Sequence, residues 1–357
     1  MSKTILITGG AGFVGSSLAL ELKKNYPEYR LFVLDNLKRR GSELSLARLK
    51  KAGIEFYHGD IRSAEDFDAL PAAVDTIIEA SAEPSVLAGI DGGLPNYVVN
   101  TNLFGTVNCL NFAVKNKSDF IFLSTSRVYP IETIERINFT ENETRFDIAA
   151  EQILEGVSEN GLSEKFPLEG FRSLYGATKL CSELLIQEYG QFYGLKTVIN
   201  RCGVLTGAWQ MGKVDQGVIV LWLAKHFWRQ NLGYFGYGGE GKQVRDILHV
   251  KDLYRLVDFQ IHNIGQLNNQ TFNVGGGRET SVSLCELTEF CRNITKNKVS
   301  IQSIPENRQA DIRIYLTDNS KVTQVTGWKP EISVQEILED IYVWIKDNEN
   351  ALTDILK

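Results

Sequence analysis

The chain has 357 residues, 43% of them hydrophobic and 23% charged, and a formal net charge of −6. This composition is ordinary for a globular protein and excludes collagen-like and disordered classes. The negative charge argues against nucleic acid as a partner, because proteins that bind it present a basic face to the phosphates. No apolar run approaches the roughly 20 residues that cross a bilayer, and no signal peptide precedes the first expected strand. We therefore expect a cytoplasmic protein without a membrane partner.

The cysteines and histidines are scattered along the chain. The five cysteines form no C-x-x-C motif, and no Cys/His cluster has the spacing of metal ligands. We therefore expect no metal site. The cysteines are expected to be reduced and to pack as small apolar residues, at positions Cys109, Cys181, Cys202, Cys285 and Cys291.

Short apolar runs alternate with amphipathic stretches, which is the pattern of βαβ units in a parallel sheet. Strands are predicted at Thr4–Thr8, Leu31–Leu34, Glu55–His58, Thr76–Glu79, Phe120–Ser124 and Thr197–Asn200. Helices are predicted near Val14–Asn25, Leu44–Lys51, Tyr97–Lys115 and Ser173–Tyr193. The predicted fold class is α/β, a Rossmann-type doubly wound parallel sheet with a smaller C-terminal substrate-binding lobe.

A glycine-rich turn follows the first predicted strand. Gly9, Gly12 and Gly15 are spaced G-x-x-G-x-x-G between this strand and the first helix, whose start includes Phe13 and Val14. The glycines permit a tight turn, close approach of the backbone to a pyrophosphate, and close packing of helix on strand. The helix N-terminus then offers free N–H groups and a positive dipole end to the phosphates. The motif predicts a dinucleotide site.

Acidic residues at the next two strand ends indicate which dinucleotide binds. Asp35 ends the second strand, where a carboxylate binds ribose hydroxyls and repels a 2′-phosphate. NAD is therefore favoured, although the basic run from Lys38 to Arg40 keeps NADP open. Asp60 is placed to meet the adenine, or it caps a helix over 63–69. The predicted cofactor contacts are Gly9, Gly12, Phe13, Val14, Gly15, Asp35, Asn36, Arg39, Asp60, Ile61, Ala80, Ala82, Ser124, Tyr175 and Lys179.

Two lobes around one cleft are expected. Residues 1–205 are expected to form the NAD-binding domain, with returns to its sheet near residues 248–275. Residues 206–357 form most of the substrate-binding lobe. An insertion at 130–170, rich in Glu, Asn and Gly, interrupts the first domain. A loop of this length is usually a lid or a partner contact, and the alternative is a peripheral helical insertion without a role in the chemistry.

Tyr175 and Lys179 stand four residues apart at the start of a predicted helix, so their side chains share one face. A lysine beside a tyrosine favours the phenolate and suits the phenol for acid–base work. Such a pair alone is most often a surface pair. Here it lies downstream of a dinucleotide motif and of Ser124-Thr125 at the carboxyl end of a strand, where open α/β sheets bind ligands.

These residues resemble the extended short-chain dehydrogenase/reductase family of nucleotide-sugar epimerases and dehydratases. The resemblance extends over Thr8–Gly15, Leu34–Leu37, Gly59–Ile61, Ser124–Tyr129, Tyr175–Lys179, Arg245–Leu253 and Arg308–Lys321. It implies a catalytic set of Thr125, Tyr175 and Lys179. Tyr175 would take the proton of a sugar hydroxyl as hydride moves to NAD, Lys179 would hold the nicotinamide ribose, and Thr125 would orient the hydroxyl.

The residues after Thr125 indicate the subgroup. Dehydratases of this family place Asp-Glu there and decarboxylases place a Glu, whereas this chain has Ser126-Arg127. Val204 also replaces an asparagine that normally meets the substrate. The strings Asp35–Ser42, Phe171–Gly176 and Trp209–Gly217 resemble CDP-paratose (CDP-tyvelose) 2-epimerases of lipopolysaccharide O-antigen synthesis. The resemblance implies epimerisation at C2 through a transient keto sugar, with NAD recycled rather than consumed.

The predicted substrate contacts are Arg127, Arg245, Arg308 and Glu83. Arg245 and Arg308 match family positions that hold the nucleotide diphosphate, which guanidinium binds bidentately, and Arg313 is a weaker candidate. Alternatively, Arg245 is a buried partner of Asp246 or Asp252, and Arg127 is a surface residue. Glu83 replaces a glutamine common in the family, so its role stays open.

Two other functions and an assembly remain open. One function is a UDP-hexose 4-epimerase with the same catalytic set, and the other is a non-enzymatic NAD-binding scaffold that keeps the fold. The apolar faces of Leu103–Val114 and Leu180–Tyr193 suggest the four-helix contact of a homo-oligomer, a dimer or tetramer. The same residues could simply pack on the sheet.

Overall fold

The computed structural model describes residues 2–89, 95–212 and 216–357. The chain divides into two compact units. Unit 1 comprises Met1–Val128, Ser173–Arg201 and Leu253–Phe272, and unit 2 comprises Tyr129–Arg172, Cys202–Asp252 and Asn273–Lys357. The insertion thus belongs to unit 2, and a segment after residue 205 belongs to unit 1. Lys213, Val214 and Asp215, within the string Trp209–Gly217, lie outside the described residues.

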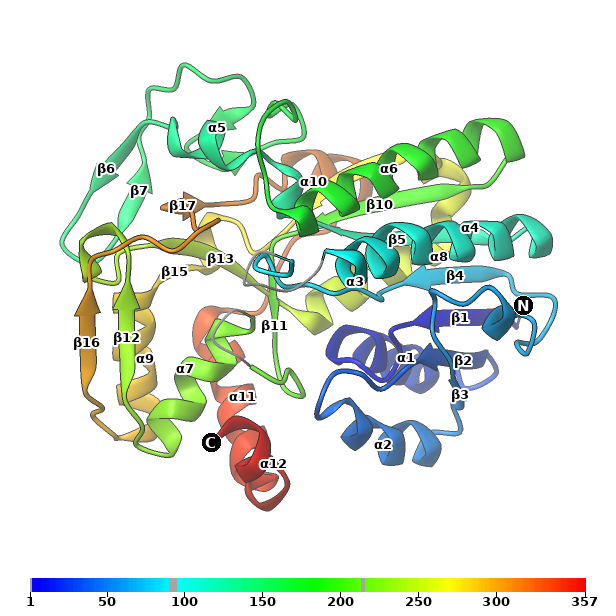
Figure 1. Cartoon of the computed structure of the whole chain (residues 1–357), viewed down its shortest axis with the longest axis horizontal. Helices are drawn as coiled ribbons and strands as arrows, with labels where there is room; N and C mark the ends of the chain where they lie inside the picture. The colour runs from blue at the N-terminus through cyan, green and yellow to red at the C-terminus, as the bar shows by residue number, and fades with distance from the viewer. Residues whose placement is uncertain (1, 90–94, 213–215) are drawn as a thin grey trace. The chain divides into compact units, whose positions relative to one another are not determined.

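A seven-stranded sheet, ordered β14-β10-β5-β4-β1-β2-β3, forms the centre of the described Rossmann fold (Figure 1). The ladders that join β3, β2, β1, β4 and β5 are parallel. Most of these strands are continuous apolar runs, as expected for a sheet covered on both faces. Their bounds are β1 Thr4–Thr8, β2 Arg30–Asp35, β3 Glu55–His58, β4 Thr76–Glu79, β5 Asp119–Thr125, β10 Thr197–Cys202 and β14 Gln270–Val274. The predicted doubly wound fold is confirmed.

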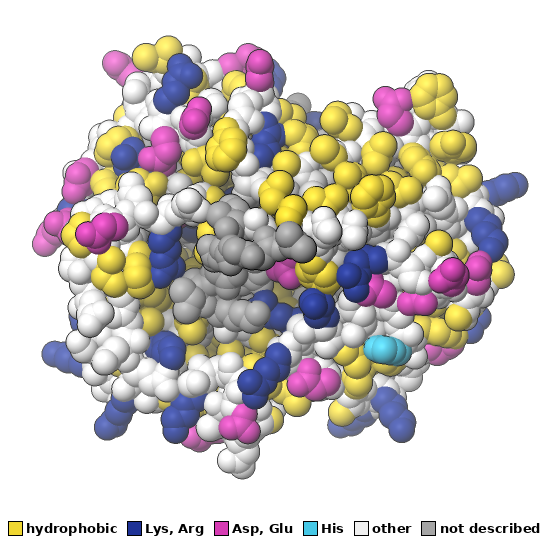
Figure 2. All heavy atoms as spheres, in the orientation of Figure 1, with side chains coloured by type: hydrophobic (Ala, Val, Ile, Leu, Met, Phe, Trp, Pro, Cys, Tyr) yellow, Lys and Arg dark blue, Asp and Glu magenta, His cyan; other side chains and the backbone are white. Residues whose placement is uncertain are grey.

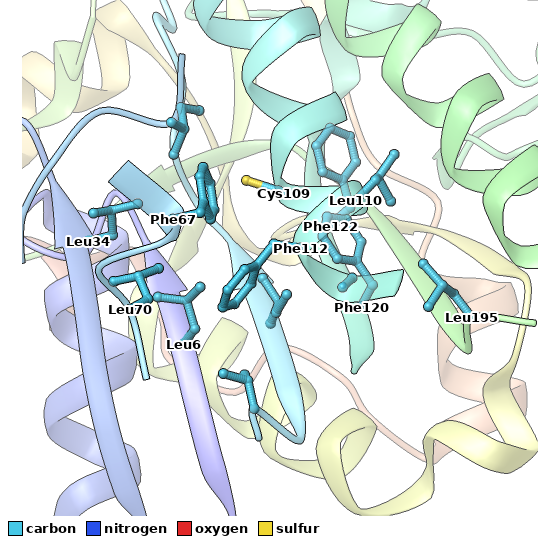
Figure 3. Packing of buried hydrophobic residues seen from close by; sticks show 14 of the residues in the cluster. Leu6, Leu34, Phe67, Leu70, Cys109, Leu110, Phe112, Phe120, Phe122 and Leu195 are labelled. Atoms are coloured by element: carbon cyan, nitrogen blue, oxygen red, sulfur yellow. The ribbon is translucent and has the colours of Figure 1, made fainter. Parts of the chain in front are cut away.

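Alternate side chains of these strands pack on opposite faces of the sheet. One face carries a core cluster with α4 (Gly105–Asn116) and α6 (Leu174–Tyr193), which run side by side (Figures 1 and 3). Its buried members include Leu6, Phe120, Phe122, Cys109 and Ile186. On the other side, Asn25 at the end of α1 (Phe13–Asn25) donates to Tyr254 of α8 (Val250–Leu267), and Tyr29 in the loop after α1 is hydrogen-bonded to His262 of α8. Helices therefore cover both faces of the central sheet.

A distorted helix leads into α4. It starts with α3 (Asn96–Val99), continues as a π-helical turn over Asn100–Phe104, and enters α4 without a break in helical backbone angles. The sequence predicts one helix near Tyr97–Lys115, and the structure adds this wider turn. Such turns are rare and often occur at functional sites. Among the described residues, no helix combines the length and apolar character needed to span a membrane.

The described part of unit 2 contains a small mixed sheet and several helices. Strands β11 (Val204–Thr206), β13 (Val244–His249), β15 (Ser281–Ser283) and β17 (Ile314–Tyr315) form one sheet, and β12 (Leu232–Phe235) pairs with β16 (Ile301–Ile304). Three helices pack together: the largely apolar and buried α7 (Val218–Phe227) and the amphipathic α9 (Leu284–Thr295) and α11 (Val334–Asp347). The remaining helices are α2 (Ser45–Lys51) in unit 1, and α10 (Ser320–Thr326) and α12 (Glu349–Leu356) in unit 2.

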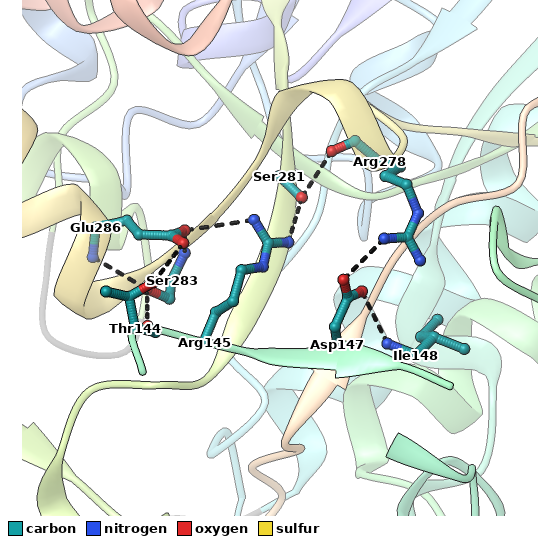
Figure 4. Close-up of polar contacts among 8 residues, drawn as sticks. All are labelled: Thr144, Arg145, Asp147, Ile148, Arg278, Ser281, Ser283 and Glu286. Atoms are coloured by element: carbon teal, nitrogen blue, oxygen red, sulfur yellow. Dashed lines mark hydrogen bonds and ion pairs between the residues drawn. The ribbon is translucent and has the colours of Figure 1, made fainter. Parts of the chain in front are cut away.

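The insertion is an anchored part of unit 2. It contains the short helix α5 (Ile131–Glu135) and the hairpins β6–β7 (Phe139–Glu141, Phe146–Ile148) and β8–β9 (Val157–Ser158, Gly161–Leu162), so it is not the mainly helical segment of one prediction. Arg145 donates to Ser281 at 2.6 Å and Asp147 accepts from Arg278 at 2.9 Å (Figure 4). Buried Leu162 and Phe166 tie the insertion to the core of unit 2, because apolar side chains stabilise the segment by leaving water.

Candidate active site

The glycine-rich turn has the close approaches that its motif predicts. Gly9 has a φ of +65°, and a Cβ atom there would lie 2.8 Å from the carbonyl oxygen of Ala80. At Gly15, a Cβ atom would lie 2.3 Å from the carbonyl oxygen of Gly9, so α1 begins directly against the turn. Gly12 is the N-cap of α1 and supplies no side-chain cap. The helix therefore presents first-turn N–H groups suited to a pyrophosphate, with Phe13 and Val14 half-buried beside them.

Asp35 ends β2 and braces this turn. Its carboxylate accepts from the backbone N–H of Ala11 at 3.0 Å and from that of Leu37 at 2.8 Å. Burial raises the pKa of Asp35, while these backbone hydrogen bonds oppose the rise. A carboxylate fixed beside the turn can accept ribose hydroxyls and disfavours a 2′-phosphate. The geometry therefore fits NAD at the position that the sequence predicts.

Asp60, in the loop directly after β3, joins a second polar cluster. Its carboxylate accepts from Asn36 at 2.8 Å and from the Arg62 guanidinium at 2.6 Å. Burial raises the pKa of Asp60, but the hydrogen bonds outweigh burial and bring it down to about 2. The alternative prediction, that Asp60 caps a helix over 63–69, is wrong. Only a short 3-10 turn forms there, at Glu65–Phe67, and the Ser63 hydroxyl accepts from its backbone N–H at Asp66.

Sequence reasoning missed an aromatic residue beside this cluster. The Nζ atom of Lys38 lies 4.4 Å from the ring centroid of Tyr97, and the Cζ atom of Arg62 lies 4.8 Å from it. Burial raises the pKa of Tyr97, which therefore stays a neutral phenol. No local motif joins residues so far apart in the chain. Arg39, a predicted cofactor contact, is half-buried, and its carbonyl accepts from Ser42.

Ile61 lies differently from the other predicted cofactor contacts. Its side chain is buried in the core, and a Cβ atom on Gly105 would lie 2.5 Å from its Cδ1 atom. Its carbonyl oxygen accepts from Asn108 at 2.8 Å. Ala80 and Ala82 follow β4 and are half-buried, with Ala80 against the glycine turn. The Ile61 side chain thus supports the site from the core.

The predicted catalytic pair lies at the start of α6. Ser173 caps this helix, accepting from the backbone N–H of Gly176 at 3.2 Å, so Tyr175 and Lys179 fall in its first two turns. Lys179 is 1% exposed, and its Nζ atom lies 3.9 Å from the ring centroid of Phe122 on β5. Tyr175 is also buried, at 9% exposure. The pair is therefore buried, unlike the exposed surface pair that this spacing most often gives.

Thr125 ends β5 beside this helix. It is buried, and its hydroxyl oxygen accepts from the backbone N–H of Arg127 at 3.1 Å. That bond fixes the Thr125 side chain in the turn Ser126–Val128. Arg127 is half-buried in the same turn. Thr125, Tyr175 and Lys179 thus all belong to unit 1, on β5 and α6.

A buried ion pair holds α6 on the sheet. Arg201 on β10 donates to Glu183 through Nε at 3.0 Å and Nη2 at 2.7 Å, and both side chains are almost fully buried. Ser124 donates to the same carboxylate at 2.5 Å. Glu183 lies one helical turn after Lys179, so the pair fixes the face that carries the lysine. The Ser124 hydroxyl, predicted to contact the cofactor, is held by Glu183.

A second buried network crosses the π-helical turn. Asn102 accepts from the backbone N–H of Glu83 at 2.7 Å, donates to its carbonyl at 3.0 Å, and donates to Thr178 on α6 at 3.3 Å. The carboxylate of Glu83 accepts from the backbone N–H of Ser85 at 3.2 Å. The segment after β4 is therefore fastened to the helix of Tyr175. No sequence pattern indicates Asn102, because its partners lie 19 and 76 residues away.

Two of the predicted substrate arginines, Arg245 and Arg308, lie in unit 2 and have partners. Arg245 donates to Asp311 at 2.8 Å and to the carbonyl of Ile312 at 2.6 Å, so neither Asp246 nor Asp252 is its ion-pair partner. The guanidinium of Arg308 stacks 3.5 Å from the Phe235 ring centroid.

Arg313 packs against the insertion. Its backbone N–H donates to Glu135 at 2.7 Å, and its guanidinium lies 3.7 Å from the same carboxylate. The rings of Phe139, Phe146 and Tyr237 surround that guanidinium at 4.0, 5.6 and 5.2 Å. Cation–π contacts of this kind stabilise a partly buried charge. Arg313 therefore helps to join the insertion to unit 2.

A model of the NAD dependent epimerase/dehydratase family matches residues 5–275. The chain belongs to this family. It is 31% identical to the CDP-paratose 2-epimerase of Salmonella typhi, over 95% of this chain and 98% of the relative. It is 29% identical to a putative UDP-glucose 4-epimerase of Methanocaldococcus jannaschii, over 97% of this chain and 100% of the relative. The predicted family and the enzyme class are confirmed.

Solved structures give the same fold. The dTDP-glucose 4,6-dehydratase DesIV of Streptomyces venezuelae, solved with NAD bound, is 26% identical with a TM-score of 0.78 and 98% coverage of both chains. The UDP-glucose 4-epimerase of Thermotoga maritima is 24% identical, with a TM-score of 0.76 and coverage of 97% of this chain and 99% of that one. The protein is an NAD-dependent enzyme of the nucleotide-sugar epimerase/dehydratase family, as the sequence predicts.

Proposed function

We propose that the protein epimerises a CDP-linked sugar at C2, converting CDP-paratose to CDP-tyvelose in the cytoplasm for surface polysaccharide synthesis. The observation that carries this proposal is the buried set of Thr125, Tyr175 and Lys179. In the sequence, Ser126-Arg127 follows Thr125 in place of an acidic pair. Elimination of water needs a further acid and base, whereas epimerisation does not. The similarity to the Salmonella enzyme supports the choice of CDP and C2.

In this reaction each side chain of the proposed site would have a separate role. Bound NAD supplies a reversible hydride acceptor. Tyr175 takes the proton of the substrate hydroxyl and returns it after the centre inverts. Lys179 keeps a positive charge beside the phenol and favours the phenolate. Thr125 orients the reacting hydroxyl, while Arg245 and Arg308 hold the diphosphate.

Separate incubations with CDP-paratose and with UDP-hexoses test this proposal, with no NAD added and with NMR of the C2 and C4 centres as the readout. We expect conversion of the CDP-sugar at C2 only. Turnover of UDP-hexoses alone would replace the proposal with a 4-epimerase, the alternative favoured by similarity to the Methanocaldococcus protein. Mass spectrometry of the denatured protein should recover NAD, because a recycled cofactor can stay bound.

The Tyr175→Phe variant distinguishes the enzyme from a non-enzymatic scaffold. Tyr175→Phe keeps the buried ring and removes the proton acceptor, so we expect full NAD content and no epimerisation. If the purified wild-type protein converts no nucleotide sugar while the Tyr175→Phe variant keeps its biological effect in cells, the scaffold alternative stands.

We also propose a homo-oligomer, a dimer or tetramer, formed through the outer face of α4 and α6. Large apolar side chains gather over these helices in Figure 2. Four large apolar residues, three on α6 and one in the turn before α4, are 56–76% exposed: Leu184, Phe192, Tyr193 and Phe104. Such a patch is unusual on a monomer. Light scattering should show that Leu184→Glu lowers the oligomeric state, whereas the equally exposed Val343→Glu on α11 does not.

A further inference from the structure

A carboxyl group lies inside the core beneath α6. Glu79 is the last residue of β4 and is 0% exposed. Its ladder partners are Thr8 on β1 and Phe122 on β5, so its side chain points to the face that α4 and α6 cover. A carboxylate in such a place is costly unless a charge or hydrogen bonds compensate it. The groups around Glu79 therefore decide its protonation state.

The hydrogen bonds of Glu79 satisfy one side of the carboxyl. Its Oε1 atom accepts from the hydroxyl of Thr106 at 2.7 Å. Thr106 also lies 3.3 Å from the Ser182 hydroxyl, and Ser182 donates to the carbonyl of Asn102 at 2.8 Å. Among the described residues, the Oε2 atom has no oxygen or nitrogen partner. The thiol of Cys109 is a further hydrogen-bond partner of the carboxyl. The carboxyl is thus fixed in orientation by Thr106 and Cys109.

The positive charge that acts on Glu79 is that of Lys179. Lys179 is 1% exposed and lies on the ring of Phe122, the ladder partner of Glu79. Burial raises the pKa of Glu79 to about 7, and the charge of Lys179 limits the rise. Cys109 on α4 is the other titratable group there, and burial keeps its thiol protonated. Thr8 and Phe122 carry no charge. Glu79 and Lys179 therefore lie in the same buried region around Phe122, where the charge of one acts on the other.

We propose that Glu79 is a positioning residue that sets the charge of the Tyr175–Lys179 pair by acting on Lys179. The inference rests on the proposed function of that pair. An anion at Glu79 raises the proton affinity of both the lysine ammonium and the tyrosine phenol. When Glu79 takes a proton, the lysine charge acts on the phenol without compensation and favours the phenolate. Glu79 thus adjusts the base of the reaction around neutral pH.

The test compares Glu79→Gln with the wild type in two measurements. The first is the pH profile of epimerisation. Both limbs should move to lower pH by about one unit, a tenfold change in each protonation equilibrium, because both groups lose a nearby negative charge. Glu79→Asp keeps the charge and should restore the wild-type profile. Glu55→Gln, on β3 of the same sheet, is the control for loss of a carboxyl.

The second measurement does not need turnover. The tyrosinate absorbance of Tyr175 is obtained across pH by subtracting Tyr175→Phe, in the wild-type and in the Glu79→Gln background. We expect the midpoint to fall by about one unit in the Glu79→Gln background. A folded variant with an unchanged midpoint would overturn the inference. A shifted midpoint without epimerisation of any nucleotide sugar would support the inference and reject the proposed function.

A second variant guards against misfolding of Glu79→Gln. Thr106→Val keeps the carboxyl and removes the hydroxyl that stabilises its anion, so the protonated form becomes dominant near neutral pH. The phenol midpoint should therefore fall in the same direction as in Glu79→Gln. A Thr106→Val protein with the wild-type midpoint would also overturn the inference.

Discussion

The polar groups at the strand ends of unit 1 and the arginines of unit 2 are held in different ways. In unit 1, Asp35 is bound by backbone N–H groups, one of them 24 residues away. In unit 2, Arg245 forms an ion pair with Asp311, which lies 66 residues later in the sequence. Arg313 donates to Glu135, which lies 178 residues earlier. Backbone N–H groups thus position Asp35, whereas ion pairs with residues distant in the sequence hold Arg245 and Arg313. A substrate diphosphate at Arg245 would have to compete with a carboxylate already bound there.

Tyr175→Phe should have the largest effect on activity. The phenol is the proposed proton acceptor, and loss of a general acid–base group typically costs 10²–10⁴-fold in rate. We expect kcat to fall by about three orders of magnitude, with the NAD content unchanged. Tyr189→Phe, which removes a hydroxyl bonded to Asn111 farther along the same helix, is the control and should keep wild-type kcat. Equal kcat for both variants would contradict the assignment.

The buried pair of Glu183 and Arg201 predicts the largest effect on stability. Glu183→Gln leaves an uncompensated guanidinium in the core, which costs about 3–5 kcal/mol. Its counterpart in unit 2 is Glu135→Gln, whose ion pair with Arg313 is partly exposed at 3.7 Å and should cost about 1–2 kcal/mol. Urea unfolding measures both variants. A larger loss for Glu135→Gln would reverse the contrast between the two units.

The sequence predicts those features of the fold and the site that depend on residues close together in the chain. The strands of the central sheet, the glycine turn and the four-residue spacing of Tyr175 and Lys179 are all read from neighbouring residues, because backbone periodicity and turn geometry act over short stretches. The partners of Arg245 and Arg313 are not read in this way. They depend on which loops meet in three dimensions, and no motif joins Arg245 to Asp311.

The buried groups behind the site also escaped prediction. Glu79 ends a run of apolar residues and could have been a solvent-facing strand end, but α4 and α6 cover it. Asn102 lies in a π-helical turn that a simple helical period does not indicate. The insertion at 130–170 shows polar composition in sequence, yet buried Leu162 and Phe166 anchor it. Tertiary contacts, rather than local propensity, decide these three places.

Glu79 also predicts a pH dependence of stability. Its folded pKa of about 7 lies above the ordinary value of 4.5, so the folded state holds the proton more tightly. Stability from this group is full below about pH 4.5 and is lost as the pH rises through about 7. The difference corresponds to roughly 3 kcal/mol. Glu79→Gln should abolish this slope in unfolding measurements at about pH 5 and about pH 8.

The matched control has the opposite sign. The hydrogen bond from Arg30 lowers the pKa of Glu55, so stability from Glu55 is present above its unfolded pKa and is lost on acidification. Glu55→Gln should therefore remove a small slope of the other direction. If Glu79→Gln and the wild type lose stability in parallel between the two pH values, then Glu79 carries no raised pKa in the folded protein.

The smallest expected effects concern the arginines of unit 2, and they decide whether Arg245 serves the substrate. Arg245→Lys cannot bind a diphosphate bidentately, so we expect KM to rise about tenfold, or about 1.4 kcal/mol, with kcat little changed. Asp311→Asn removes the carboxylate that competes for the guanidinium, and KM should fall. Steady-state kinetics with the converted nucleotide sugar measure both. If neither variant changes KM, Arg245 is a structural residue like Arg313, and the diphosphate binds to other groups.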